Sequence, residues 1–129
     1  MFYFEIENNK VGGDYLNKDI YYYWKIGKLI YSLEESCMNV HQRFSEYFSY
    51  YYGNSNIYTR ENLYLMKRFY INFPIFYETL NLLSWNQYCL LFQIKNKQEM
   101  YFYFRLSLYF HSDLDETSQF IHNRYFLRI

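Results

Sequence analysis

The chain has 129 residues, of which 51% are hydrophobic and only one is proline, so it can bury a core, and the composition excludes a mainly disordered tail. Thirteen Lys and Arg residues balance thirteen Asp and Glu residues, which excludes a global electrostatic field that would hold a polyanion. Any nucleic-acid site must therefore be a local patch.

Residues 1–13 are predicted to form a short N-terminal strand or an arm that packs on a neighbour, because Phe2, Phe4 and Ile6 alternate with other residues. Residues 14–129 are predicted to form a single helical domain. Asp14 is a candidate N-cap for a long helix that extends to about residue 35. Gly27 lies in the inward stripe of this helix, where glycine costs about 1 kcal/mol, and it therefore predicts a close contact with another helix.

The best-defined prediction is a capped, amphipathic helix that begins after Thr59, whose hydroxyl can accept the backbone N–H of Asn62. Its inward stripe is predicted from helical spacing as Leu63, Met66, Tyr70 and Phe73. A helix over residues 39–52 and a turn cluster over residues 53–56 precede it, which is the order of a helix-turn-helix-like unit. Any helical hairpin would show the same order.

Further helices are predicted downstream of Pro74, which ends or kinks the capped helix near Asn72. Ser84 can cap one of them, residues 97–109 read as another, and Asp113 or Asp115 can cap a terminal helix that continues to Arg128. The predicted fold class is all-α, a compact multi-helix bundle with short connections.

The outer face of the capped helix carries the candidate DNA-binding residues. Basic side chains can contact phosphates, and the Asn62 amide near the amino end of this helix can face a base or bond the preceding turn. The candidates are Arg60, Asn62, Tyr64, Lys67 and Arg68. The tyrosines at 47 and 50–52 offer stacking surfaces for single-stranded bases, or simple packing.

No catalytic residue, metal site or cofactor is expected. Asp113, Asp115 and Glu116 lie where a helix start favours acidic side chains, so capping is preferred over a metal site. The three histidines at 41, 111 and 122 are far apart in sequence, and Cys37 and Cys89 have no metal-ligand spacing. We expect buried thiols in a cytoplasmic protein with no leader peptide and no membrane partner.

Four separated segments resemble the N-terminal domain of the YhcG-type PD-(D/E)XK nuclease family. They are YWKIGKLI at 23–30, YTRENL at 58–63 followed by Met66, Phe69 and Tyr70, LSW at 83–85, and residues 121–128. The resemblance extends from about Tyr15 to the C-terminus. This chain departs from the family pattern at Glu61, where the family usually has Arg, and at Gln87, where a His is expected.

The resemblance implies a helical module that precedes a separate nuclease domain and that binds DNA or serves in assembly. A PD-(D/E)XK site needs an acidic residue two positions before a lysine, and no such pair occurs in this chain, so no nuclease activity is predicted. The expected partners are DNA, and a nuclease domain or another protein. The alternative is a homodimerisation or protein-interaction domain that uses exposed aromatic residues.

Overall fold

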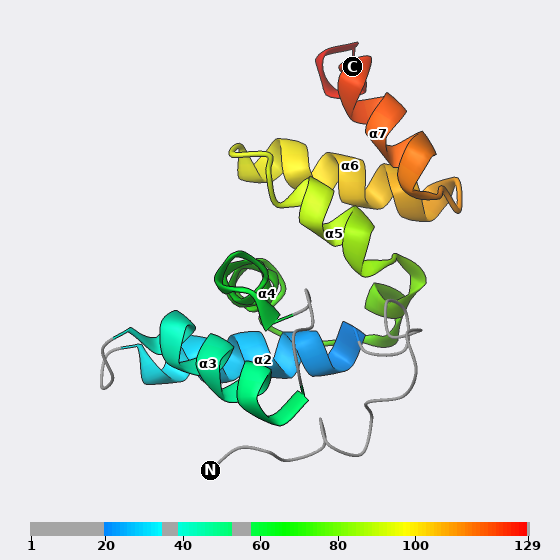
Figure 1. The fold of residues 1–129 in the computed structure, drawn as a ribbon. Helices are drawn as coiled ribbons and strands as arrows, with labels where there is room; N and C mark the ends of the chain where they lie inside the picture. The colour runs from blue at the N-terminus through cyan, green and yellow to red at the C-terminus, as the bar shows by residue number, and fades with distance from the viewer. Residues whose placement is uncertain (1–19, 35–38, 53–57, 129) are drawn as a thin grey trace. The chain divides into compact units, whose positions relative to one another are not determined.

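The computed structural model describes residues 20–34, 39–52 and 58–128, and they form an all-α fold without a strand in these ranges (Figure 1). The chain divides into two compact units. We call Tyr21–Phe76 the N-terminal unit. The other unit contains Ile20 and the described residues from Tyr77 onward, and we call it the C-terminal unit. The predicted arm over residues 1–13 and the predicted helix start at Asp14 lie outside the described residues. The single domain over residues 14–129 stays a prediction.

The N-terminal unit is built from three helices, α2 (Ile20–Leu33), α3 (Val40–Tyr52) and α4 (Arg60–Asn72). Helices α3 and α4 pack on each other. Figure 1 shows α4 along its axis, whereas α2 and α3 run across the view, so α4 crosses both of them steeply. The order of the helices agrees with the predicted helix-turn-helix-like unit, whose connecting turn lies outside the described residues.

Gly27 of α2 lies directly against the backbone of α4. A Cβ atom at this position would overlap the carbonyl group of Met66 and would lie 3.0 Å from the backbone nitrogen of Lys67. The close helix contact predicted from this glycine is therefore confirmed. A second backbone contact comes from Trp24, whose Nε1 donates a hydrogen bond of 2.7 Å to the carbonyl oxygen of Phe73.

The buried side of α4 differs from the predicted stripe at one position. Leu63, Met66 and Phe69 have no exposed surface, whereas Tyr70 is only half-buried. The Tyr70 ring instead lies against Trp24 and Tyr31 of α2, at centroid distances of 5.6 and 5.5 Å. Phe69 takes the inward place because Tyr70 occupies the flank of α4 that faces α2.

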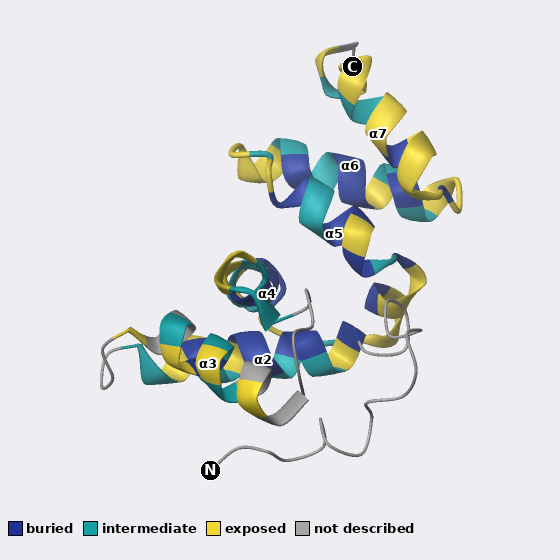
Figure 2. Cartoon of the chain, in the orientation of Figure 1, coloured by how far each residue is buried: buried dark blue, intermediate teal, exposed yellow. Residues whose placement is uncertain are grey.

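The C-terminal unit contains η3 (Glu78–Leu82), α5 (Trp85–Leu91), α6 (Lys97–Tyr109), α7 (Leu114–His122) and η4 (Tyr125–Arg128). Helices α5, α6 and α7 pack on one another, and Figure 2 shows buried residues along α5 and α6. The prediction of one terminal helix to Arg128 is wrong. Asn123 ends α7, and Arg124 adopts a left-handed φ of 56°, which interrupts the helical path before η4.

Gln87 of α5 is the centre of a buried hydrogen-bond network that links α5, α6 and α7. Its side chain is buried, and Nε2 donates to the carbonyl oxygen of Ser112 at 2.8 Å and to Oγ1 of Thr117 at 3.0 Å. Its Oε1 accepts the backbone N–H of Ser84 at 2.9 Å, and Thr117 shares a further hydrogen bond with Ser107 of α6. The side-chain position where the family pattern places His is thus a buried polar hub.

Candidate nucleic-acid interface

Helix α4 is fixed at both ends by features that the sequence predicts. The Thr59 hydroxyl accepts the backbone N–H of Asn62 at 3.1 Å, and α4 begins at Arg60. It ends at Asn72, and Phe73 donates its backbone N–H to the carbonyl oxygen of Phe69. The predicted cap and the predicted end before Pro74 are both confirmed, so the angular positions of the side chains on α4 are well defined.

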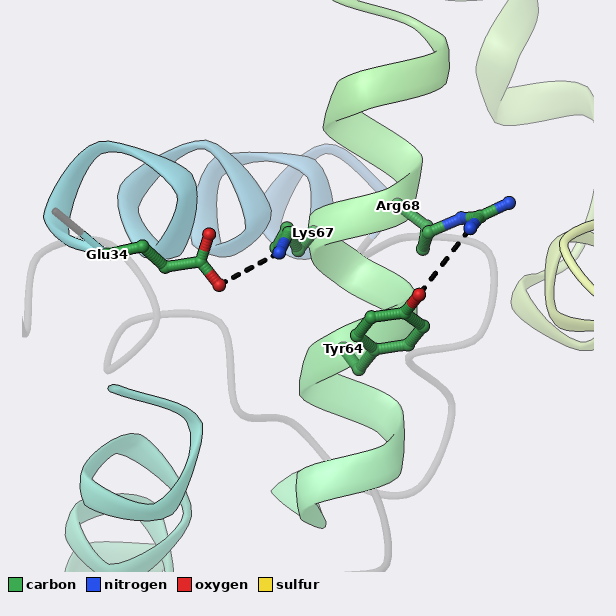
Figure 3. Close-up of polar contacts among 4 residues, drawn as sticks. All are labelled: Glu34, Tyr64, Lys67 and Arg68. Carbon is green, nitrogen blue, oxygen red and sulfur yellow. Dashed lines mark hydrogen bonds and ion pairs between the residues drawn. The ribbon is translucent and has the colours of Figure 1, made fainter. Parts of the chain in front are cut away.

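Three of the five candidate residues share the exposed side of α4. Arg60, Tyr64 and Arg68 are spaced four residues apart, so they lie in a row along one face. Tyr64 is 45% exposed. The Nη1 atom of Arg68 lies 3.5 Å from the Tyr64 hydroxyl, which is placed to accept a long hydrogen bond (Figure 3). We call Arg60, Tyr64 and Arg68 the α4 row.

Lys67 leaves α4 in a different direction from Tyr64 and Arg68. Figure 3 shows its side chain directed to Glu34 at the end of α2, and the ion pair between Nζ and Oε2 measures 2.9 Å. The Lys67 and Glu34 side chains are 19% and 30% exposed. The Lys67 charge is thus partly shielded and partly neutralised. It still lies 5.8 Å from the centre of the Tyr64 ring, which keeps it next to the α4 row.

Asn62 is not brought to the α4 row. It precedes Met66 and Phe69 at intervals of four and seven residues, so it lies on the inward side of α4. The side chain is half-buried, and the backbone N–H is bonded to Thr59. Of its two predicted roles, this position agrees with the structural role beside the preceding turn.

Glu61 lies exposed in the first turn of α4, next to Arg60. A carboxylate at this place is stabilised by the partial positive charge of the helix N-terminus. The same carboxylate opposes the approach of a phosphate to the amino end of the α4 row. Where the family pattern has a second basic residue, this chain therefore carries a repelling group.

Two further acidic residues, Asp113 and Glu116, have a structural role. Asp113 and Glu116 form a reciprocal capping box at the start of α7, with hydrogen bonds of 2.9 and 3.0 Å, which confirms the capping interpretation. Burial raises the pKa of the Cys89 thiol to about 12, so it is protonated at neutral pH and is a poor nucleophile. Cys37 lies outside the described residues.

His111 and His122 are exposed, and the described ranges contain no group of three or more His, Cys, Asp or Glu side chains that could hold a metal ion. No helix in the part of the chain that the structure describes is long and apolar enough to cross a membrane.

The exposed side of α2 carries aromatic and basic side chains that are not among the residues predicted for the site. The Nζ atom of Lys25 lies 5.0 Å from the centre of the Tyr21 ring, and Nζ of Lys28 lies 5.5 Å from the centre of a Trp24 ring. The signal in the sequence is the spacing of Tyr21, Lys25 and Lys28 by four and three residues, which places them on one helix face.

The described residues thus form an all-α fold, and its N-terminal unit carries a basic and aromatic helix face. A family model for the DUF1016 N-terminal domain matches residues 14–128. The chain belongs to this family, which is the N-terminal domain of the YhcG-type proteins. Neither a curated protein nor a solved structure gives a significant match to the chain.

Proposed function

We propose that this domain is a non-catalytic module that binds DNA, or that places a nuclease partner on DNA, through α4. The observation that carries the proposal is the α4 row, in which two guanidinium groups flank an exposed tyrosine on one helix face. Arginine forms charge-assisted bonds with phosphate oxygens in a planar fork, which suits a helix lying against a phosphate backbone. Membership of the DUF1016 N-terminal domain family supports a role beside a nuclease domain.

The α4 row contacts phosphates in this proposal, and it orients the domain without reading sequence. Lys67 is a secondary contact because Glu34 already holds its ammonium group. Asn62 is assigned to the helix start and not to a base, because it lies on the inward side of α4. The family's expected second basic group is replaced by Glu61, so we expect moderate affinity.

A salt titration of duplex DNA binding tests the proposal. We expect the double variant Arg60→Ala, Arg68→Ala to weaken binding and to reduce the slope of log K against log salt by about 0.9 for each phosphate that the variant no longer neutralises. Arg105→Ala is the matched control, because Arg105 is an exposed arginine on α6 of the C-terminal unit. Binding that responds neither to salt nor to the double variant would refute the proposal.

A second candidate function is protein interaction through the C-terminal unit. Tyr109 and Phe110 are 77% and 56% exposed. Their rings lie 4.9 Å apart, and Phe110 continues the row to Phe120 at 6.0 Å. Exposed aromatic rows of this kind commonly mark interfaces. Light scattering of the wild type and of Phe110→Ser tests self-association, and a monomer throughout the micromolar range would contradict it.

A further inference from the structure

A second aromatic and basic surface lies on α2. Tyr21, Lys25, Lys28 and Tyr31 follow one another at intervals of four, three and three residues, so they occupy the same broad side of the helix. Lys28 is exposed, and the two tyrosines at the ends are 41% and 51% exposed. We call these four residues the α2 face.

Helix α2 contributes basic and no acidic side chains to the α2 face, and Lys28 is its exposed cation. The sequence of α2, IYYYWKIGKLIYSL, contains two lysines and no acidic residue. The Lys28 ammonium group lies over the Trp24 ring, a contact that holds the side chain while leaving the full charge available to an anion. Glu34, which follows α2, is engaged by Lys67 of α4.

The aromatic members of the α2 face are held in place by other rings. Tyr21 is stacked parallel to Trp24, with centroids 6.0 Å apart, and contacts Phe76 edge-on at 5.0 Å. Tyr31 packs against Tyr70 of α4 at 5.5 Å while half of its surface stays exposed. A ring that is already ordered loses little conformational freedom when a flat ligand stacks on it.

We propose that the α2 face binds single-stranded nucleic acid, with Lys28 contacting a phosphate and Tyr31 stacking on a base. Exposed rings that flank cations are the combination that such strands require, because each unpaired base presents a flat surface and each linkage a negative charge. A duplex keeps its bases stacked internally and would use only Lys28. This surface is separate from the α4 row, so the proposal goes beyond the function proposed above.

Fluorescence anisotropy with fluorescein-labelled oligo(dT) tests the proposal on the full 129-residue chain. Tyr31→Ala should weaken binding at least about fivefold, the loss of one stacked base. Lys28→Gln should lower the slope of log K against log salt by about 0.7, the value for one phosphate of a single strand. Lys28 is exposed, so its variant provides a test even if Tyr31→Ala disturbs folding.

Lys97→Gln is the matched control, because Lys97 also lies over a tyrosine ring, that of Tyr101 at 6.0 Å, but belongs to the C-terminal unit. Absence of oligo(dT) binding, an equal loss in the control, or equal competition by polyglutamate would overturn the proposal. The α4 variants Arg60→Ala and Arg68→Ala separate the two functions. They should leave oligo(dT) binding within about twofold of wild type even if duplex binding is absent.

Discussion

Lys67 and Arg68 are neighbours in the sequence but are held in different ways. Lys67 forms a 2.9 Å ion pair with Glu34 of the same unit, whereas the nearest polar contact of Arg68 in the described ranges is the neutral hydroxyl of Tyr64. A phosphate that approaches α4 must displace a carboxylate to reach Lys67, but no acidic group to reach Arg68. The two cations should therefore contribute unequally to DNA binding.

Replacing Glu34 should strengthen duplex binding. In Glu34→Gln the Lys67 ammonium group loses its anionic partner, and we expect the dissociation constant for duplex DNA to fall about two- to fivefold, in line with the modest strength of a partly exposed ion pair. Anisotropy titrations at low salt provide the measurement. Glu46→Gln on α3 is the control, because Glu46 is exposed and accepts a hydrogen bond from Gln42. An unchanged or weaker affinity in Glu34→Gln would contradict this account.

Replacing Gln87 should destabilise the protein strongly. Gln87→Leu removes the side chain that bonds the Ser84 N–H and the Ser112 carbonyl, and it removes one of the two hydrogen bonds of the Thr117 hydroxyl. We expect a loss of about 2–4 kcal/mol in the free energy of unfolding. Urea unfolding followed by circular dichroism measures it. The exposed Gln93, whose side chain donates to Cys89, supplies the control Gln93→Leu, which should stay within about 0.5 kcal/mol. Equal effects of both variants would argue against a buried hub.

At the scale of helices, much of the fold follows from short-range signals. The caps at Thr59, Ser84 and Asp113 each bond a backbone N–H only three residues away, so the sequence alone predicts them. Residues 97–109 are likewise predicted and observed as one helix. Local side-chain chemistry is sufficient wherever both partners of an interaction lie within one turn of the helix.

The sequence predicts a close helix contact at Gly27, but it does not predict which side chains from different helices meet. Glu34 and Lys67 are 33 residues apart, and Gln87 and Thr117 are 30 residues apart, so their pairing depends on how helices cross. The place of Asn62 near the amino end of the helix suits either a base contact or a bond to the preceding turn, whereas its spacing to Met66 places it on the inward side. The helix break at Arg124 depends on a left-handed φ angle, and this position has no glycine that would have predicted it.

The contact between α2 and α4 should not tolerate a methyl group. In Gly27→Ala the new Cβ meets the Met66 carbonyl, a backbone group that cannot rotate away. We expect a loss of about 3 kcal/mol or more in the free energy of unfolding. Ser32→Ala on the same helix is the control and should change stability by less than about 1 kcal/mol, since Ser32 is exposed. Urea unfolding that leaves Gly27→Ala as stable as wild type would show that the helices can separate there.

For the whole molecule, the equal numbers of acidic and basic residues mean that binding depends on patches and not on net charge. We expect the salt dependence of duplex binding to be shallow. If Arg60, Lys67 and Arg68 each contact one phosphate, the slope of log K against log salt should be no steeper than about −3. Titrations across a range of salt concentrations measure it, and a much steeper slope would indicate a larger surface than the α4 row.

Raising the pH should destabilise the protein. Burial raises the pKa of Cys89 from 9.0 to about 12, and burial together with nearby Tyr77 raises the pKa values of Tyr88 and Tyr101. Above about pH 9 the unfolded chain loses protons that the folded chain keeps, so the free energy of unfolding falls as pH rises. The decline should begin with Cys89 and steepen above the ordinary tyrosine value of 10.0.

Urea unfolding at several pH values, with Cys89→Ala beside the wild type, tests this expectation. The variant should show a smaller decline between about pH 9 and pH 10, because it lacks the group that titrates first in the unfolded chain. Identical declines for both proteins would mean that the Cys89 thiol is not the source.

The absence of a side chain at Gly27 also fixes the register between α2 and α4. Since two backbones touch there, sliding α2 along α4 by a single residue would bring a bulky neighbour, Ile26 or Lys28, into a gap that admits only hydrogen. The contact therefore fixes the position of α2 relative to α4, and with it the distance between the basic residues of the two helices. A nucleic acid that contacts both helices would have to match this distance, because the two helices cannot move apart along their contact.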